Sequence, residues 1–210
     1  MKAVVTIVLL LCVLLIGSIY YDTSIAINDK ITVLESENAE LRKSEETLDL
    51  AMEFGFDPMI VKITQQLSEN VMRSRNAQPG TTTWRFVRTD KELAYLLLSV
   101  VQVESGGDPA AYNKSGASGL TQLMFSTARM YDKKLQPNEL FTIPKHLQIA
   151  VDHFVDLLDR YNGNPTLAVL AWNRGSGIVD RTLALGQSPE NGYSKLIYER
   201  AVLRNAERLD

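Results

Sequence analysis

The sequence is poor in the residues that build disulfides, metal sites and nucleic-acid surfaces. It contains one cysteine, Cys12, and two histidines, His146 and His153. An internal disulfide and a cysteine–histidine metal cluster are therefore excluded, and no cofactor is expected. A net charge of −3 without any local cluster of lysine and arginine makes nucleic acid an unexpected partner. We expect both histidines to lie on helix surfaces.

The chain does contain enough apolar sequence for one ordinary core. It has 210 residues, of which 45% are hydrophobic and 22% charged, so one domain with an appendage is expected. Apolar residues recur at helical spacing after two proline-marked starts, Pro58 and Pro144. These stripes are Ile60, Ile63, Leu67 and Val71, and Leu147, Val151, Phe154 and Leu158. The pattern predicts a mainly α fold.

A long uncharged run opens the chain. From Ala3 to Tyr21 no charged residue occurs, and the length approaches the roughly 20 residues that cross a bilayer as a helix. We predict a transmembrane signal anchor over residues 1–26. A signal peptide cleaved near Ser24-Ile25-Ala26 is the alternative. Either interpretation exports the rest of the chain.

Residues 27–54 follow a four-three apolar rhythm that is typical of a short coiled coil. Its apolar positions are Ile27, Ile31, Leu34, Leu41, Leu48 and Met52, with Asn38 and Glu45 at intervening seam positions. A seam asparagine would fix the register of a homodimer formed through this stalk. A solvated spacer helix is the alternative. Residues 55–83 are predicted as an accessory helix and a linker, with Asp57 as the helix N-cap.

Glu104 stands where a core residue is expected. A capping box at Thr89 and Glu92 starts a helix whose stripe of Leu93, Leu97 and Val100 continues to Glu104, and Gly106-Gly107 ends it. Burial disfavours an ionised carboxyl group, raises its pKa and prepares it as a general acid. Asp108, beyond the two glycines, is interpreted as a turn residue.

Three further motifs identify a resemblance. Glu104-Ser105, the run from Gly116 to Gln122 and the triplet Ala171-Trp172-Asn173 occur in the order and spacing of the soluble-lytic-transglycosylase-type muramidases. The chain resembles this family from about Lys91 to Leu203. The resemblance implies a lysozyme-like, mainly helical catalytic domain, placed here at residues 84–210, that is related to goose-type lysozymes and cleaves peptidoglycan glycan strands.

Site residues carry over from the resemblance one by one. It implies that Glu104 is acid and base, that Ser105 supports it beside the glycan, and that Gln122 and Asn173 hydrogen-bond the sugar. Trp172 would stack on a sugar ring. Tyr193 matches the tyrosine near the family's C-terminal helix and would also bind the substrate, with Tyr198 as the weaker alternative. The sequence departs from the family pattern where a methionine, proline, tyrosine and alanine are usual, at Thr121, Phe125, Trp172 and Arg174 respectively.

The family's reaction needs a single carboxylate. The resemblance implies a lytic transglycosylase that forms 1,6-anhydro-N-acetylmuramic acid ends, because the sugar supplies the attacking hydroxyl. A hydrolytic muramidase and a non-catalytic peptidoglycan-binding assembly protein are the alternatives. We expect a single-pass inner-membrane protein with its catalytic domain in the periplasm or on the cell-wall side. Secretion after signal cleavage, or a phage-encoded protein, is the alternative.

Overall fold

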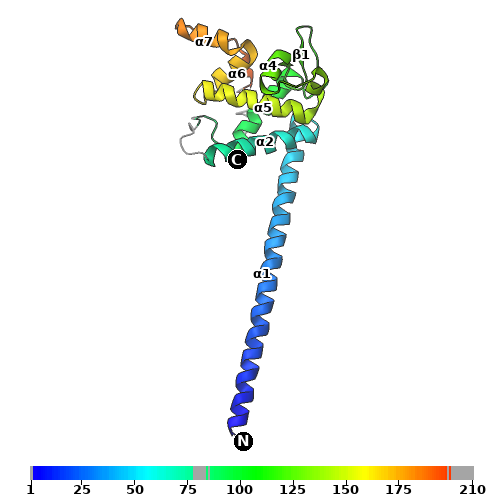
Figure 1. The fold of residues 1–210 in the computed structure, drawn as a ribbon, viewed down its shortest axis with the longest axis vertical. Helices are drawn as coiled ribbons and strands as arrows, with labels where there is room; N and C mark the ends of the chain where they lie inside the picture. Colours follow the sequence, from blue (N-terminus) through cyan, green and yellow to red (C-terminus); the bar gives the residue numbers. More distant parts are fainter. Residues whose placement is uncertain (1, 78–83, 85, 198, 200–210) are drawn as a thin grey trace. The chain divides into compact units, whose positions relative to one another are not determined.

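The protein is mainly helical, as predicted. Its structure, a computed structural model, describes residues 2–77, 84, 86–197 and 199, with the side chains of residues 2–14, 19 and 77 outside the description. Figure 1 shows the course of the chain, which forms two compact units, residues 1–48 and 49–210. The first unit consists of helix α1 (Lys2–Phe54) up to Leu48.

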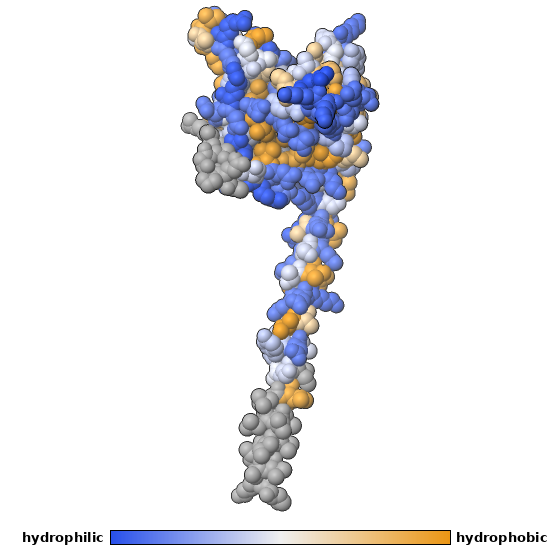
Figure 2. Space-filling view, viewed as in Figure 1, coloured by the Kyte–Doolittle hydropathy of each residue, from blue (hydrophilic) through white to orange (hydrophobic). Residues whose placement is uncertain are grey.

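The first unit carries apolar side chains on its described surface, as Figure 2 shows. The predicted seam residues Ile27, Ile31, Leu34, Leu41 and Leu48 are between 46% and 62% exposed. Over the described residues, no helix combines the length and the apolar character that a membrane crossing requires. Most of the predicted anchor's apolar side chains, those of residues 2–14, lie outside the described part, so the anchor stays a prediction.

Helix α2 begins where the sequence predicts it. Gly55 adopts a φ of +69° after the end of α1, and the Asp57 carboxylate accepts a hydrogen bond from the Met59 N–H at 2.8 Å. Pro58 is the first residue of α2 (Pro58–Ala77). Ile60 and Val61 are completely buried, and α2 packs against α3. This helix therefore shares the core of the second unit.

Helix α3 (Asp90–Glu104) is largely buried in the core of the second unit. Its predicted capping box is present, because the Glu92 N–H donates to Thr89 Oγ1 at 3.1 Å and the Thr89 N–H donates to Glu92 Oε2 at 3.0 Å. Every residue from 93 to 101 is buried, so apolar surroundings extend beyond the predicted stripe. Gly107 follows the helix with a φ of +89°, and a Cβ atom added to it would lie 2.5 Å from the Phe56 ring. The backbone thus turns sharply after Glu104.

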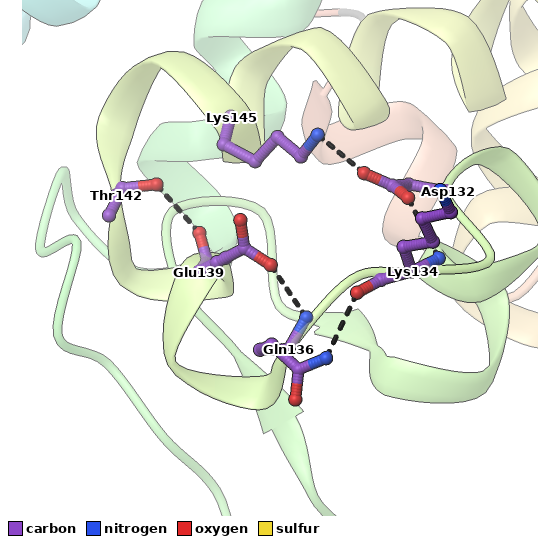
Figure 3. Close-up of polar contacts among 6 residues, drawn as sticks. All are labelled: Asp132, Lys134, Gln136, Glu139, Thr142 and Lys145. Carbon is purple, nitrogen blue, oxygen red and sulfur yellow. Dashed lines mark hydrogen bonds and ion pairs between the residues drawn. The ribbon is translucent and has the colours of Figure 1, made fainter.

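A group of short elements follows α3, and the sequence pattern did not predict them individually. Strands β1 (Ala117–Ser118) and β2 (Leu123–Met124) pair antiparallel and are followed by α4 (Phe125–Tyr131) and the 3₁₀ helix η1 (Pro137–Phe141). Figure 3 shows how side chains tie η1 to its flanks. The Gln136 N–H donates to Glu139 Oε2 at 2.6 Å, and Lys145 pairs with Asp132 at 2.5 Å.

The remaining helices complete the core. Helix α5 (Ile143–Arg160) packs against α2, α4 and α6 (Pro165–Arg174), and α7 (Ser176–Ala184) follows (Figure 1). The predicted stripe of α5 is buried. The prediction that both histidines lie on helix surfaces is wrong: His146 is 1% exposed and His153 is half-buried. His146 precedes Ala150, Phe154 and Leu158 at steps of four residues, which places it on the buried stripe.

Candidate active site

Glu104 is the last residue of α3, and its carboxyl group is half-buried. Burial raises the pKa of this group, as the sequence predicts, while a hydrogen bond from the Tyr193 hydroxyl to Glu104 Oε1 acts in the opposite direction. A carboxyl group with a raised pKa holds a proton closer to neutral pH. The phenol then stabilises the carboxylate that remains once the proton has left.

Tyr193 is suited to remain a donor. Burial and the neighbouring Glu104 carboxylate both raise the pKa of the Tyr193 hydroxyl, so it keeps its hydrogen at physiological pH. Its ring packs against the main core as a partly buried residue. The structure therefore joins two predicted site residues that lie 89 positions apart. Tyr198, the alternative, lies outside the described residues.

The end of α6 holds the segment that carries Tyr193, here called the Tyr193 loop (residues 186–194), whose last two residues begin a short helix over 193–197. The Asn191 amide donates to Asn173 Oδ1 at 3.0 Å, and the Tyr193 N–H donates to Asn191 Oδ1 at 3.2 Å. Arg174 Nη1 donates to the Pro189 carbonyl at 2.7 Å. A chain of hydrogen bonds thus links Asn173 to the backbone of Tyr193 through Asn191. By holding that backbone, Asn173 supports the position of the phenol at Glu104.

Glu190 closes the loop on itself. Its carboxylate accepts hydrogen bonds from the Asn191 and Gly192 N–H groups at 3.0 and 2.8 Å, and from the buried Ser194 hydroxyl. The hydrogen bond from Ser194 is the main cause that holds the pKa of Glu190 below its usual range. Sequence reasoning missed Glu190, Asn191 and the role of Arg174, since their partners are backbone and loop groups that no periodic pattern marks.

Ser105 is bonded within the protein. Its hydroxyl donates to the Leu120 carbonyl at 2.7 Å and accepts from the Gly107 N–H at 3.1 Å. The end of α3 is thereby tied to the turn between β1 and β2. We interpret Ser105 as support for the backbone around Glu104, while its place beside the glycan, which the resemblance implies, stays a prediction.

Gln122 sits in that same turn with an unusual backbone. Its φ is +51°, in the left-handed region that costs a non-glycine residue about 1–3 kcal/mol. Its side-chain amide donates to the carbonyls of Gly119 and Ala111 at 3.0 and 3.2 Å, so the nitrogen faces the protein. Among the described residues the Gln122 Oε1 atom has no hydrogen-bond donor. This oxygen is suited to accept from a hydroxyl or an acetamido N–H.

Trp172 takes part in a cluster of rings. Its ring centroid lies 5.0 Å from that of His153 and 5.8 Å from that of Phe154, both on α5. Tyr131 donates to Asp156 at 2.7 Å and also contacts His153 Nδ1 at 3.0 Å. Part of the Trp172 ring is therefore used for packing. Stacking on a sugar stays a prediction that rests on the half-exposed remainder.

Hydrogen bonds join some of the predicted site residues and not others. Within the described residues, hydrogen bonds connect Glu104 to Tyr193, and Asn173 to Tyr193 through Asn191, whereas Gln122 and Trp172 have none to the Glu104 carboxylate. Asp108 is exposed and its Oδ1 accepts the Ala110 N–H at 2.8 Å. That bond confirms Asp108 as a turn residue.

Known proteins match the part of the chain that holds these residues. The family model "Transglycosylase SLT domain" matches residues 88–194, a range that includes every residue from Glu104 to Tyr193. An inactive mutant of the lytic transglycosylase Slt from Pseudomonas aeruginosa shares 21% identity and a TM-score of 0.50 over 55% of this chain. The soluble lytic transglycosylase SLT70 from Escherichia coli shares 20% identity and a TM-score of 0.47 over 51% of this chain. The aligned parts cover 22% and 21% of those two chains.

Proposed function

The chain belongs to the transglycosylase SLT domain family, and we propose that it is a lytic transglycosylase of bacterial peptidoglycan. Such an enzyme is a carbon–oxygen lyase that breaks the β-1,4 bond between N-acetylmuramic acid and N-acetylglucosamine. The observation that carries the proposal is the Glu104–Tyr193 pair: a carboxyl group with a raised pKa and a phenol that donates to it.

The first step uses the protonated form of Glu104. The carboxyl group gives its proton to the glycosidic oxygen while the bond to the anomeric carbon breaks. The acetamido oxygen of the muramic acid stabilises the positive charge that develops on that carbon. The Tyr193 hydroxyl donates to the new carboxylate, which lowers the free energy of the charged state.

The second step uses Glu104 as a base. The carboxylate removes the proton from the C6 hydroxyl of the same muramic acid, and that oxygen bonds to the anomeric carbon to close a 1,6-anhydro ring. One carboxylate serves both steps, so the reaction needs neither a second carboxylate nor water. We propose that Gln122, Asn173 and Trp172 bind the glycan and that Ser105 and Tyr193 hold the site around Glu104.

Substitution Glu104→Gln tests the catalytic assignment. The amide keeps the size of the side chain and can still accept from Tyr193, but it cannot transfer a proton at working pH. We expect release of soluble fragments from purified sacculi to fall by about 10²–10⁴-fold. Asp108→Asn is the matched control because it removes the neighbouring carboxylate and retains the turn acceptor, and it should cleave as wild type. Unchanged cleavage by Glu104→Gln would contradict the proposal.

The products separate this reaction from the alternatives. Mass spectrometry of the digest should show muropeptides with anhydro ends, lighter by one water than the reducing ends that a hydrolytic muramidase releases. Reducing ends would assign the chain to the hydrolases. Binding to sacculi without any cleavage, in wild type as in Glu104→Gln, would favour the non-catalytic binding protein.

We further propose that residues 1–26 anchor the protein in the inner membrane and that the catalytic domain acts on the cell-wall side. The support is the uncharged run from Ala3 to Tyr21 and the peptidoglycan substrate of the proposed reaction. Fractionation of cells with a carbonate wash tests it. Retention in the washed membrane supports the anchor, while release as a shortened soluble chain indicates a cleaved signal peptide.

A further inference from the structure

A buried histidine lies against the turn that carries Gln122. His146, on α5, is 1% exposed, and its ring lies so close to Gly119 that a Cβ atom there would be 2.5 Å from His146 Nδ1. Gly119 therefore has to be glycine for the ring to fit, quite apart from its φ of +71°. The contact joins α5 to the β1–β2 turn. Its two partners, Thr121 and His146, lie 25 residues apart in the sequence.

The partners of the ring define its protonation state. The Thr121 N–H donates to His146 Nε2 at 3.0 Å, so Nε2 bears no hydrogen. On the other side, Nδ1 lies 2.9 Å from the Leu140 carbonyl, which can only accept, so Nδ1 carries the hydrogen. The Thr121 hydroxyl also faces Nε2, at 2.8 Å. His146 is thus a neutral imidazole with a donor and an acceptor in use.

The carbonyl that receives the Nδ1 hydrogen is itself fixed. Leu140 belongs to η1, whose start is held by the Gln136–Glu139 contact and whose end is held by the Thr142 hydroxyl, which donates to the Glu139 carbonyl at 2.7 Å (Figure 3). Lys145, the residue before His146, pairs with Asp132 across the same segment. The imidazole therefore connects a braced segment to the turn.

One hydrogen bond connects the turn to the end of α3, and another holds the Gln122 side chain within the turn. The Leu120 carbonyl, next to Thr121, accepts from Ser105, and the Gly119 carbonyl accepts from the Gln122 amide. Gln122 follows Thr121 and holds its left-handed backbone only as long as its surroundings keep it there. A shift of the Thr121 N–H would therefore displace both the hydrogen-bond acceptor of Ser105 and the backbone of Gln122.

We propose that His146 is a positioning residue of the active site, whose neutral imidazole holds the turn from Gly119 to Gln122 in the conformation that directs Gln122 to the glycan and supports Ser105 beside Glu104. This role deepens the proposed function and rests on it. A leucine at this position would fill a similar volume but would leave the Thr121 N–H and the Leu140 carbonyl without partners. The hydrogen bonds, beyond the packing, are what the site requires.

Kinetics on purified sacculi with the full chain test the role. His146→Leu should lower kcat about tenfold and also raise KM, because Glu104 is then supported less well and Gln122 holds the substrate less well. His146→Gln, whose amide offers a donor and an acceptor, should recover most of kcat. In the Gln122→Ala background, His146→Leu should cost clearly less than tenfold, because the part of its effect that passes through Gln122 is already lost. A full tenfold loss in that background would overturn the proposal, since none of the effect would then pass through Gln122.

Leu158→Ala is the matched control for stability. Leu158 is a fully buried residue of α5, so its truncation should lower the unfolding temperature but leave kcat within a factor of two. An equal loss of kcat in Leu158→Ala would show that His146 affects the rate only through the stability of the core. That outcome would contradict the positioning role.

Nitrogen-15 NMR separates this inference from the proposed function. In wild type, the hydrogen of the His146 ring should be on Nδ1. The resonance of the Gln122 side-chain amide should keep its wild-type position in His146→Gln and should be absent from that position in His146→Leu. A hydrogen on Nε2, or an unchanged Gln122 amide in His146→Leu, would overturn the inference. If wild type cleaves no glycan, the proposed function fails while these spectra still decide the role of His146.

Discussion

Glu104 combines two opposing influences on one carboxyl group. Burial at the end of α3 raises its pKa, and the Tyr193 hydroxyl acts the other way by stabilising the charged form. A group that must first give and then take a proton needs both forms to be accessible, and this pair supplies a physical means for each. The balance depends on a single hydroxyl that can be removed.

Tyr193→Phe removes the donor and should raise the pKa of Glu104 further. Because the protonated form starts the reaction, the alkaline limb of the kcat/KM profile should move to higher pH. The rate should fall about tenfold, since the carboxylate loses a hydrogen bond of about 1.5–3 kcal/mol. Tyr161→Phe is the control, because Tyr161 also donates to a carboxylate, Asp180, at 2.9 Å. An unmoved alkaline limb in Tyr193→Phe would contradict this account.

His146 should make stability depend on pH. Burial lowers the pKa of His146 to about 4 from 6.5, so the unfolded chain binds the proton more readily than the folded one. The stability due to its neutral form is complete above pH 6.5 and is lost as pH falls to about 4, a difference of about 3 kcal/mol. Urea unfolding should show this loss in wild type and not in His146→Gln. Thr121→Val should keep it, because the ring remains.

At the scale of elements, the Tyr193 loop depends on the end of α6. Asn173 and Arg174 are the last residues of that helix, and each bonds to the loop, through Asn191 and through the Pro189 carbonyl. Arg174 is also a position where the sequence departs from the family pattern. Its contact with Pro189 supplies a structural account of that departure.

Arg174→Ala should loosen the loop without unfolding the domain. The loss of one hydrogen bond of about 1 kcal/mol should lower kcat/KM about fivefold and speed amide exchange across residues 186–194. Arg181→Ala, on the exposed side of α7, is the control and should change neither quantity. Normal exchange in Arg174→Ala would show that other contacts hold the loop.

Elements differ in how far the sequence predicts them. Helices α2, α3, α5 and α6 carry their own start signals and apolar stripes, so their positions follow from local chemistry. The strands β1 and β2 have two residues each, and η1 and α4 are short. Such elements have too little periodicity to predict, because distant groups such as His146 hold them in place.

At the scale of the whole molecule, the stalk is predicted to form a homodimer, with a solvated spacer helix as the alternative. The full chain in mild detergent should sediment as a dimer, and Leu34→Glu with Leu41→Glu should make it a monomer, because charges would enter the seam. Val33→Glu is the control, since Val33 is 54% exposed and lies off the seam. A wild-type monomer at all concentrations would assign residues 27–54 to the solvated spacer.

The sequence alone determined the mainly helical class, the carboxylate on an apolar helix, its capping box, its terminating glycines and the family resemblance. These features are local, because they depend on spacing and residue type over a few turns. Tertiary structure decided which groups meet: Tyr193 with Glu104, Ser105 with Leu120, and Thr121 with a buried His146 that the sequence had placed on the surface. Such contacts follow from packing between distant segments, and no local pattern encodes them.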